Sequence, residues 1–192
     1  MPCSSLVVGA SLGGLTALKT LLGGLPPEFG LPVAIAQHRD AAGEGSLAAW
    51  LHRHSSLAVA EAEDKEEIVP GTVRLAPAGY HLLVDGDRYA LSTEGPVRHA
   101  RPSIDLLFES AAESCGTGAV GLILTGTGPD GSRGLAAIKL AGGLAIVQDP
   151  ASAECPEMPS AAIAATAVDH VLPLAQIAPF LLGLASVTEA AR

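Results

Sequence analysis

The sequence is poor in aromatic and charged residues. Aromatic side chains make up 3% of the 192 residues and charged side chains 16%, whereas hydrophobic residues make up 48%. This apolar content excludes intrinsic disorder. The chain is long enough to bury a full hydrophobic core, and no linker or internal repeat interrupts it. We therefore expect residues 1–192 to form a single domain.

Long hydrophobic runs, a signal peptide and a cysteine pattern are also missing. The most apolar stretch, residues 168–187, is interrupted by prolines and polar residues, so we expect no direct membrane insertion. The N-terminus carries no basic segment. Three cysteines are too few and too scattered for a disulfide framework or a zinc site. These absences predict a cytoplasmic protein without a bound metal.

Basic residues are scarce. The chain has 11 Lys and Arg against 20 Asp and Glu, which gives a net charge of −9. A surface of this sign excludes nucleic acid as a partner, because phosphate binding needs an excess of cations. Part of the acidic excess lies in residues 61–67, which we interpret as a solvated connection.

Short apolar runs alternate with helical patterns along the chain. Runs at 6–10, 32–37, 119–124 and 144–147 are typical of strands buried on both faces. Helical spacing of apolar residues occurs in 15–22, 45–55, 104–111, 131–141, 159–167 and 175–190. This order predicts an α/β fold with a doubly wound, mainly parallel sheet and helices on both faces. Short strands at 72–76, 81–84 and 89–92, with a turn at residues 85–87, predict an added antiparallel β-hairpin flap.

The first predicted turn fits the G-x-S-x-G pattern of a serine nucleophile. Gly9-Ala10-Ser11-Leu12-Gly13 lies between a buried strand and a helix, where a sharp turn exposes the serine hydroxyl. The N–H groups at the start of that helix suit an oxyanion. Gly9, Ser11 and Gly14 also approximate a dinucleotide-binding turn. That alternative expects an acidic residue after the second strand, where this chain has Gln37-His38.

Two further strand ends supply a base and a carboxylate. His38 follows the second strand, and Asp130 lies in the glycine-rich loop Thr125–Gly131 after the third. Because parallel strands end at one edge of a sheet, these residues are candidates for a Ser-His-Asp triad with Ser11. Asp130 could instead be the N-cap of the helix that follows it.

Several motifs in one order resemble the catalytic domain of the CheB-type chemotaxis receptor methylesterases. They are Gly9 to Gly14, Gln37-His38, Pro70-Gly71, Ala76-Pro77, Arg101-Pro102-Ser103-x-Asp105, Leu124 to Gly131 and Met158-Pro159. The resemblance covers nearly the whole chain. It implies hydrolysis of glutamate γ-methyl esters on chemoreceptor cytoplasmic helices, with release of methanol, and deamidation of certain receptor glutamines. The implied partner is the methylated cytoplasmic helical bundle of a chemoreceptor.

The resemblance also implies roles for single residues. Ser11 would be the nucleophile, His38 the general base and acid, and Asp130 the residue that orients His38. The backbone N–H groups of Leu12 and Thr127 would bind the oxyanion, and no metal or organic cofactor is implied. The candidates for substrate binding are Arg98, His99, Arg101 and Met158.

The sequence departs from the family pattern around the expected pocket. Leu12 replaces a threonine, Thr127 a methionine and Glu157 a glycine, and Ala100 interrupts a basic pattern. The residues after His38, 39–43, replace a proline-rich aromatic loop. No receiver domain precedes the first strand, so we expect regulation, where it occurs, to come from a separate receiver or another chemotaxis-type signalling protein. The same triad on another ester or amide, a nucleotide- or phosphate-binding module, and an adaptor without turnover remain as alternatives.

Overall fold

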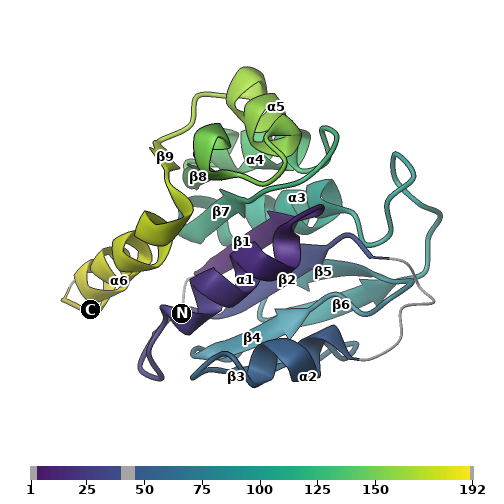
Figure 1. Cartoon of the computed structure of the whole chain (residues 1–192). Coiled ribbons are helices and arrows are strands. Elements are labelled where there is room, and N and C mark those ends of the chain that lie inside the picture. Colours follow the sequence, from purple (N-terminus) through teal and green to yellow (C-terminus); the bar gives the residue numbers. More distant parts are fainter. Residues whose placement is uncertain (1–3, 40–45, 191–192) are drawn as a thin grey trace.

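The computed structural model describes residues 4–39 and 46–190, which are built around a seven-stranded parallel sheet (Figure 1). Its strands are β1 (Ser5–Ala10), β2 (Val33–Gln37), β3 (Ala58–Glu61), β4 (Thr72–Leu75), β7 (Ala119–Ile123), β8 (Leu144–Gln148) and β9 (His170–Leu172). They are arranged in the order β3-β4-β2-β1-β7-β8-β9. All six neighbouring pairs run parallel, so the carboxyl ends of β1, β2 and β7 meet at the centre of one edge.

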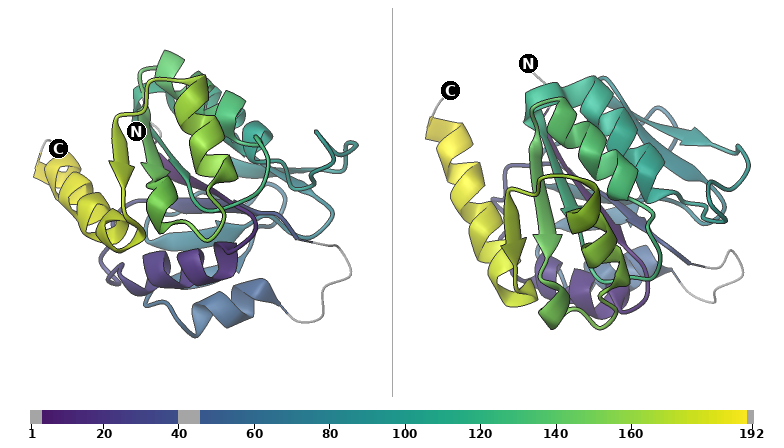
Figure 2. Two further views of the ribbon diagram at one scale, coloured as in Figure 1. Left: turned by 45° about the horizontal axis from the view of Figure 1, so that its top comes forward. Right: turned by 90° about the horizontal axis from the view of Figure 1, so that it is seen from above.

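Helices cover both faces of the sheet (Figure 2). One layer contains α1 (Gly14–Gly23), α2 (Leu47–His52) and α6 (Leu174–Ala190), and the other contains α3 (Ile104–Cys115), α4 (Ser132–Leu140) and α5 (Glu157–Ala165). Alternate residues of β1 serve the two layers: Leu6 and Val8 pack with the first, and Val7 packs with the second. This burial on both faces explains the uninterrupted apolar run. The doubly wound fold predicted from the sequence is confirmed.

A separate antiparallel hairpin lies beside α3. It consists of β5 (His81–Asp85) and β6 (Arg88–Ser92), and its turn contains Gly86 at φ 60°. The hairpin is fastened to α3 by Val84, whose N–H donates to Ser110 Oγ at 3.0 Å and whose carbonyl accepts from Ser114 Oγ at 2.9 Å. The predicted β-hairpin is confirmed.

One predicted strand has a different partner, and two strands were not predicted. Residues 72–76 were assigned to the antiparallel flap, but β4 lies in the main sheet, parallel to β2 and β3. The connection assigned to residues 61–67 begins with the last residue of β3, and β9 was also missed. Both β3 and β9 are edge strands of three or four residues with partly exposed side chains, so they lack the apolar run of a central strand. No helix in the described part of the chain is long and apolar enough to cross a membrane.

Candidate active site

The three chemical candidates leave adjacent strands at the centre of the sheet. Ser11 follows β1, His38 follows β2, and the loop that carries Asp130 follows β7. Backbone hydrogen bonds continue the ladder past the strand ends: Ser11 N–H donates to the Thr125 carbonyl and His38 N–H to the Ala10 carbonyl, each at 3.0 Å. The structure therefore places Ser11, His38 and Asp130 at one edge of the sheet, as expected for parallel strands.

The turn around Ser11 depends on glycine at two positions. Gly13, the N-cap of α1, has φ 79°, a conformation that side chains with a Cβ rarely adopt. A Cβ on Gly14 would lie 2.0 Å from Oε1 of Gln37. The turn therefore brings the backbone of α1 against the end of β2 and leaves Ser11 half-buried, with access to solvent.

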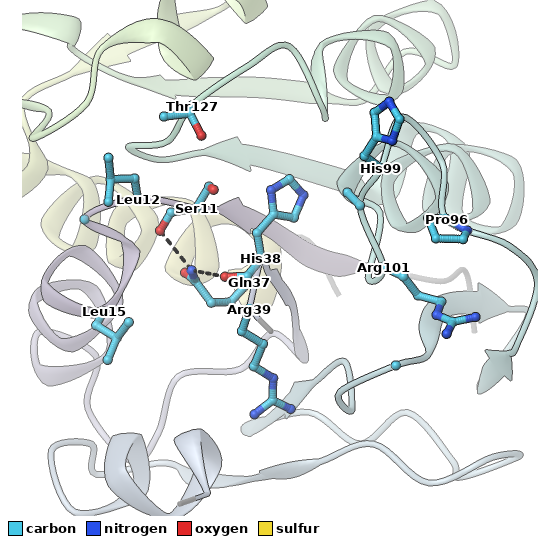
Figure 3. A pocket seen from close by; sticks show the side chains of 13 residues that line it. Ser11, Leu12, Leu15, Gln37, His38, Arg39, Pro96, His99, Arg101 and Thr127 are labelled. Atoms are coloured by element: carbon cyan, nitrogen blue, oxygen red, sulfur yellow. Dashed lines mark hydrogen bonds between the residues drawn. The ribbon is translucent and has the colours of Figure 1, made fainter. Parts of the chain in front are cut away.

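His38 is hydrogen-bonded to Asp130. Its Nε2 lies 2.7 Å from Oδ2 of Asp130, and the side chains are 21% and 6% exposed. A carboxylate accepts, so Nε2 carries the proton and Nδ1 is the ring nitrogen with a free lone pair. The Ser11 hydroxyl points toward the His38 ring (Figure 3), although no hydrogen bond joins the two in the described contacts. Such catalytic contacts often tighten only when substrate is bound.

Asp130 is held by more than His38. Its Oδ2 also accepts from the N–H of Ile104 at 2.8 Å, and its Oδ1 accepts from the N–H of Asp105 at 3.0 Å and from Ser103 Oγ at 3.2 Å. Burial by itself would raise the pKa of the Asp130 carboxyl, but the hydrogen bonds from His38, Ile104 and Asp105 lower that pKa below its ordinary value. Asp130 is therefore a carboxylate suited to stabilise a positive charge on the imidazole.

The alternative assignment of Asp130 as the cap of the following helix is wrong. The N–H groups at the start of α4 donate instead to Asp105, and Asp130 binds N–H groups at the start of α3. The sequence shows the loop and the helix on either side of Asp130, but it does not show that α3 begins beside the same loop.

Two backbone N–H groups near Ser11 are available to an oxyanion. Within the described residues, the N–H groups of Leu12 and Thr127 have no hydrogen-bond acceptor. The neighbouring N–H groups of Thr125, Gly126 and Gly128 are engaged by Gln148, Cys155 and Glu157. Both Leu12 and Thr127 line the same pocket as Ser11, so the oxyanion role that the family resemblance implied for their N–H groups is compatible with this geometry and stays a prediction.

Ser11 and His38 lie in a pocket of about 730 Å³. Its lining consists of Ser11, Leu12, Gly13, Leu15, Gln37, His38, Arg39, Gly79, Pro96, His99, Ala100, Arg101 and Thr127. Leu12 and Leu15 form one side, and Pro96, His99 and Arg101 lie on the opposite side (Figure 3). None of these lining residues is acidic.

The predicted substrate-binding residues have different environments. His99 and Arg101 line the pocket, and Arg101 Nη1 donates to the carbonyls of Thr93 and Glu94, each at 3.1 Å. Arg98 is exposed and is not among the lining residues. The prediction for Met158 is not supported, because its side chain is fully buried and presents no surface to a substrate.

The structure also locates residues at other positions where the sequence departs from the family pattern. Glu157 Oε2 accepts from Gly128 N–H at 3.2 Å, and Ala100 lines the pocket. Of residues 39–43, Arg39 lines the pocket and its Nη2 lies 2.6 Å from Oε1 of Glu61; residues 40–43 lie outside the described residues. In the described part of the chain, no group of three His, Cys, Asp or Glu side chains is arranged to hold a metal ion.

Gln37 belongs to the Gln37-His38 motif, but the sequence predicts no role for its side chain at the site. Its Nε2 donates to the carbonyls of Ser11 and His38, each at 2.9 Å, and the side chain is 4% exposed (Figure 3). The available signal was an amide side chain at the end of an otherwise apolar strand, because such a group needs buried partners. Gln37 thus joins the Ser11 turn to the end of β2. The strand therefore ends in an amide and not in the acidic residue that a dinucleotide site expects there.

The comparison with known protein families agrees with this geometry. Residues 6–181 match the family model of the CheB methylesterases. The chain belongs to the CheB methylesterase family. Its fold superimposes on the crystal structure of the Thermotoga maritima CheB methylesterase catalytic domain with a TM-score of 0.91 and 33% identity, covering 96% of this chain and 100% of that one.

Relatives of the CheB methylesterase family differ in length. A Leptospira interrogans protein named as a protein-glutamate methylesterase/protein-glutamine glutaminase is 45% identical over 185 residues, which are 96% of both chains. The Myxococcus xanthus protein-glutamate methylesterase FrzG is 42% identical over 182 residues, which are 94% of this chain and 54% of that protein. An Anaeromyxobacter dehalogenans protein-glutamate methylesterase/protein-glutamine glutaminase is 44% identical, and the match covers 50% of its length.

Proposed function

We propose that the protein is a serine esterase that hydrolyses glutamate γ-methyl esters on the cytoplasmic helices of chemoreceptors. The observation that carries this proposal is the 2.7 Å hydrogen bond between His38 and Asp130 beside Ser11, at three neighbouring strand ends of a CheB-type fold. The exposed side chains of Leu12 and Leu15 at the rim offer apolar contact to a helix that presents the ester.

Acylation would begin with attack of Ser11 Oγ on the γ-ester carbonyl carbon. His38 Nδ1 takes the hydroxyl proton as the new C–O bond forms, while Asp130 holds Nε2–H and stabilises the imidazolium. The oxyanion of the tetrahedral intermediate lies against the N–H groups of Leu12 and Thr127. When the intermediate collapses, the bond to methoxide breaks, His38 protonates the leaving group, and methanol departs.

Deacylation would follow the same route with water as nucleophile. His38 takes a proton from water, the hydroxide attacks the glutamyl carbonyl, and the proton returns to Ser11 Oγ as the acyl bond breaks. The product is a free glutamate carboxylate. The same steps on a glutamine side chain would release ammonia, so the activity named for the Leptospira and Anaeromyxobacter relatives as protein-glutamine glutaminase needs no additional residue.

Methanol release from methylated receptor membranes tests this proposal. We expect release by the wild-type protein and none above background by Ser11→Ala. Hydrolysis of a small activated ester by the wild type without methanol release would support the triad and reject the receptor substrate. Absence of Ser11-dependent hydrolysis of any ester would reject the esterase and favour a binding or adaptor protein.

A further inference from the structure

Asp105 is a buried carboxylate that takes no part in the proposed chemistry. It lies in the first turn of α3 and is 0% exposed. Its Oδ1 accepts from the N–H groups of Gly131 and Gly134, each at 2.9 Å. Burying a carboxylate is unfavourable unless hydrogen bonds or an opposite charge compensate for the lost hydration. The hydrogen bonds from these two N–H groups supply that compensation.

The two donors belong to the start of α4, directly after Asp130. Gly131 is the N-cap of α4 and has φ 93°, and no side chain of its own segment caps the helix. Asp105 supplies the missing acceptor from α3. The first turn of α4 is therefore held by the neighbouring helix and not by a local cap.

Asp130 has the converse role at the start of α3. It accepts from the N–H groups of Ile104 at 2.8 Å and Asp105 at 3.0 Å. Asp105 therefore lies at the positive end of α4, the helix that Asp130 precedes. Asp130 lies at the positive end of α3, the helix whose first turn contains Asp105. Because Gly131 is covalently joined to Asp130, a shift of Gly131 would move the carboxylate that binds His38.

We propose that Asp105 is a positioning residue for the esterase, which holds Asp130 in reach of His38 by binding the first turn of α4. The inference deepens the proposed function and rests on it. Asp105 touches neither substrate nor His38, so its effect is exerted through Asp130 alone.

The surroundings of Asp105 make asparagine an informative replacement. Asp105 Oδ2 has no hydrogen-bond partner in the described residues, and the nearest cation, Arg133 Nε, is 3.8 Å away and is paired with Glu109. Asparagine places an amide nitrogen at the position of Oδ2, and this change breaks no hydrogen bond because Oδ2 accepts none in the described contacts. The amide oxygen can still accept from the N–H groups of Gly131 and Gly134. Burial also raises the pKa of the Asp105 carboxyl above its ordinary value, with the hydrogen bond from Gly134 opposing that rise, so a neutral side chain is compatible with the site.

The first test compares Asp105→Ala with Asp105→Asn on a small activated ester. For Asp105→Ala we expect kcat to fall about 100-fold, the effect of a displacement of roughly 1 Å at a catalytic group, with KM changed less than about twofold. Asp105→Asn should restore most of the wild-type kcat. Wild-type kcat in Asp105→Ala, or equal losses in both variants, would overturn the proposal.

A matched control separates positioning from stability. Asp169 also accepts a backbone N–H, from Ala145 at 2.8 Å, and pairs with Lys139, but it does not line the Ser11 pocket. Asp169→Ala should lower Tm and leave kcat unchanged. An equal loss of kcat in Asp169→Ala at matched Tm would mean that Asp105 acts through stability, and would overturn the proposal.

A second measurement does not depend on turnover. The ring ¹⁵N resonances of His38, assigned with His38→Gln, should show a protonated Nε2 and an unprotonated Nδ1 in the wild type. We expect this single tautomer in Asp105→Asn and an averaged signal in Asp105→Ala. If the wild type hydrolyses no ester, the proposed function fails, and an unchanged His38 signal in Asp105→Ala then overturns the positioning role independently.

Discussion

Residues with no chemistry of their own surround the candidate triad. Gln37 is the clearest case, because one amide group contacts the carbonyls of both Ser11 and His38. Thr125 adds a second connection, in which its hydroxyl donates to the Leu12 carbonyl at 2.9 Å. The distance between nucleophile and base is therefore controlled by the strand ends together with these two side chains.

Replacement of Gln37 by leucine should lower kcat while KM stays nearly constant. Leucine removes both hydrogen bonds and frees the Ser11 turn from β2. In the described contacts it leaves the His38 carbonyl without a donor, while the Ser11 carbonyl still accepts from the Gly14 N–H. We expect a loss of about 10- to 100-fold. Steady-state hydrolysis of a small activated ester measures it. Gln176→Leu on the exposed face of α6 is the control, and a similar loss there would contradict the interpretation.

Replacement of Asp130 by asparagine should affect both activity and the pH dependence of stability. Because the folded protein lowers the pKa of Asp130, its ionised form stabilises the fold above the unfolded pKa of about 3.9, and this contribution is lost as pH falls through the lower folded pKa. The difference in unfolding free energy between wild type and Asp130→Asn should therefore be largest near neutral pH and shrink in acid.

Urea unfolding at a series of pH values measures this difference, and ester hydrolysis at neutral pH measures the activity. We expect kcat to fall about 10⁴-fold, as when the carboxylate of a serine triad is replaced by its amide. Asp169→Asn removes another carboxylate whose pKa is lowered, but its activity should equal that of the wild type. A stability difference that grows toward low pH would contradict the assignment.

The sequence predicted the triad candidates but not their supporting contacts. Ser11, His38 and Asp130 could be proposed because each follows a buried apolar run, and parallel strands end at one edge. The contacts of Gln37 and Asp105 could not, because they depend on how strand ends and helix starts meet across the fold. The same limit applies to Met158, which is fully buried, because a motif position does not show whether a side chain faces the pocket or the core.

Among the elements, the pair α3 and α4 matters most for the site. Gly134 lets the two helices approach: a Cβ there would lie 2.5 Å from Phe108 Cβ and 2.8 Å from the Asp105 carbonyl oxygen. Gly134 N–H is also one of the two donors to Asp105. Gly134 therefore determines both how closely α3 and α4 pack and one of the hydrogen bonds to Asp105.

Gly134→Ala should destabilise the protein although alanine favours helix. The gain in helix propensity is about 1 kcal/mol, and the overpacking between helices costs about 1–3 kcal/mol, so we expect a net loss. Denaturant unfolding measures it, and kcat should fall as well because α4 moves away from Asp105. Gly95→Ala, where a Cβ would meet nothing within 4 Å, is the control. Increased stability of Gly134→Ala would contradict the packing argument.

Central elements could be predicted from the sequence and peripheral ones could not. The buried strands β1, β2, β7 and β8 have apolar side chains on both faces, which gives a pattern that few other structures produce. Strand β4 was recognised as a strand but assigned the wrong neighbours, because its pairing with β2 joins residues about 40 positions apart in the chain. Local patterns contain no information on such pairing.

At the scale of the whole molecule, the charge of the pocket lining differs in sign from the net charge of the protein. The chain carries a net charge of −9, yet the pocket lining contains Arg39 and Arg101 and no acidic side chain. Arg39 is paired with Glu61, whereas Arg101 donates only to neutral carbonyls in the described contacts. Arg101 is thus the arginine of the pocket lining that has no carboxylate partner in the described contacts, and it favours substrates with negative charge near the ester.

Ionic strength should therefore alter the choice between substrates. Peptides with a γ-methyl glutamate flanked by glutamates should react faster than peptides flanked by glutamines at low salt. The ratio of their kcat/KM values should fall when the Debye length is reduced from about 30 Å to about 3 Å. Arg101→Gln should lower the ratio at low salt, while the exposed Arg53→Gln should not. A salt-independent ratio would contradict the electrostatic argument.

The reciprocal hydrogen bonds of Asp105 and Asp130 at the starts of α4 and α3 also affect how fast the amide protons involved exchange with solvent. The N–H groups of Ile104 and Asp105 are protected by a residue outside α3, and those of Gly131 and Gly134 by a residue of α3. Neither helix can fray at its first turn without exposing donors of the other. These four amides should therefore exchange with deuterium at a common rate, as one cooperative opening unit, whereas the first turns of independent helices open separately.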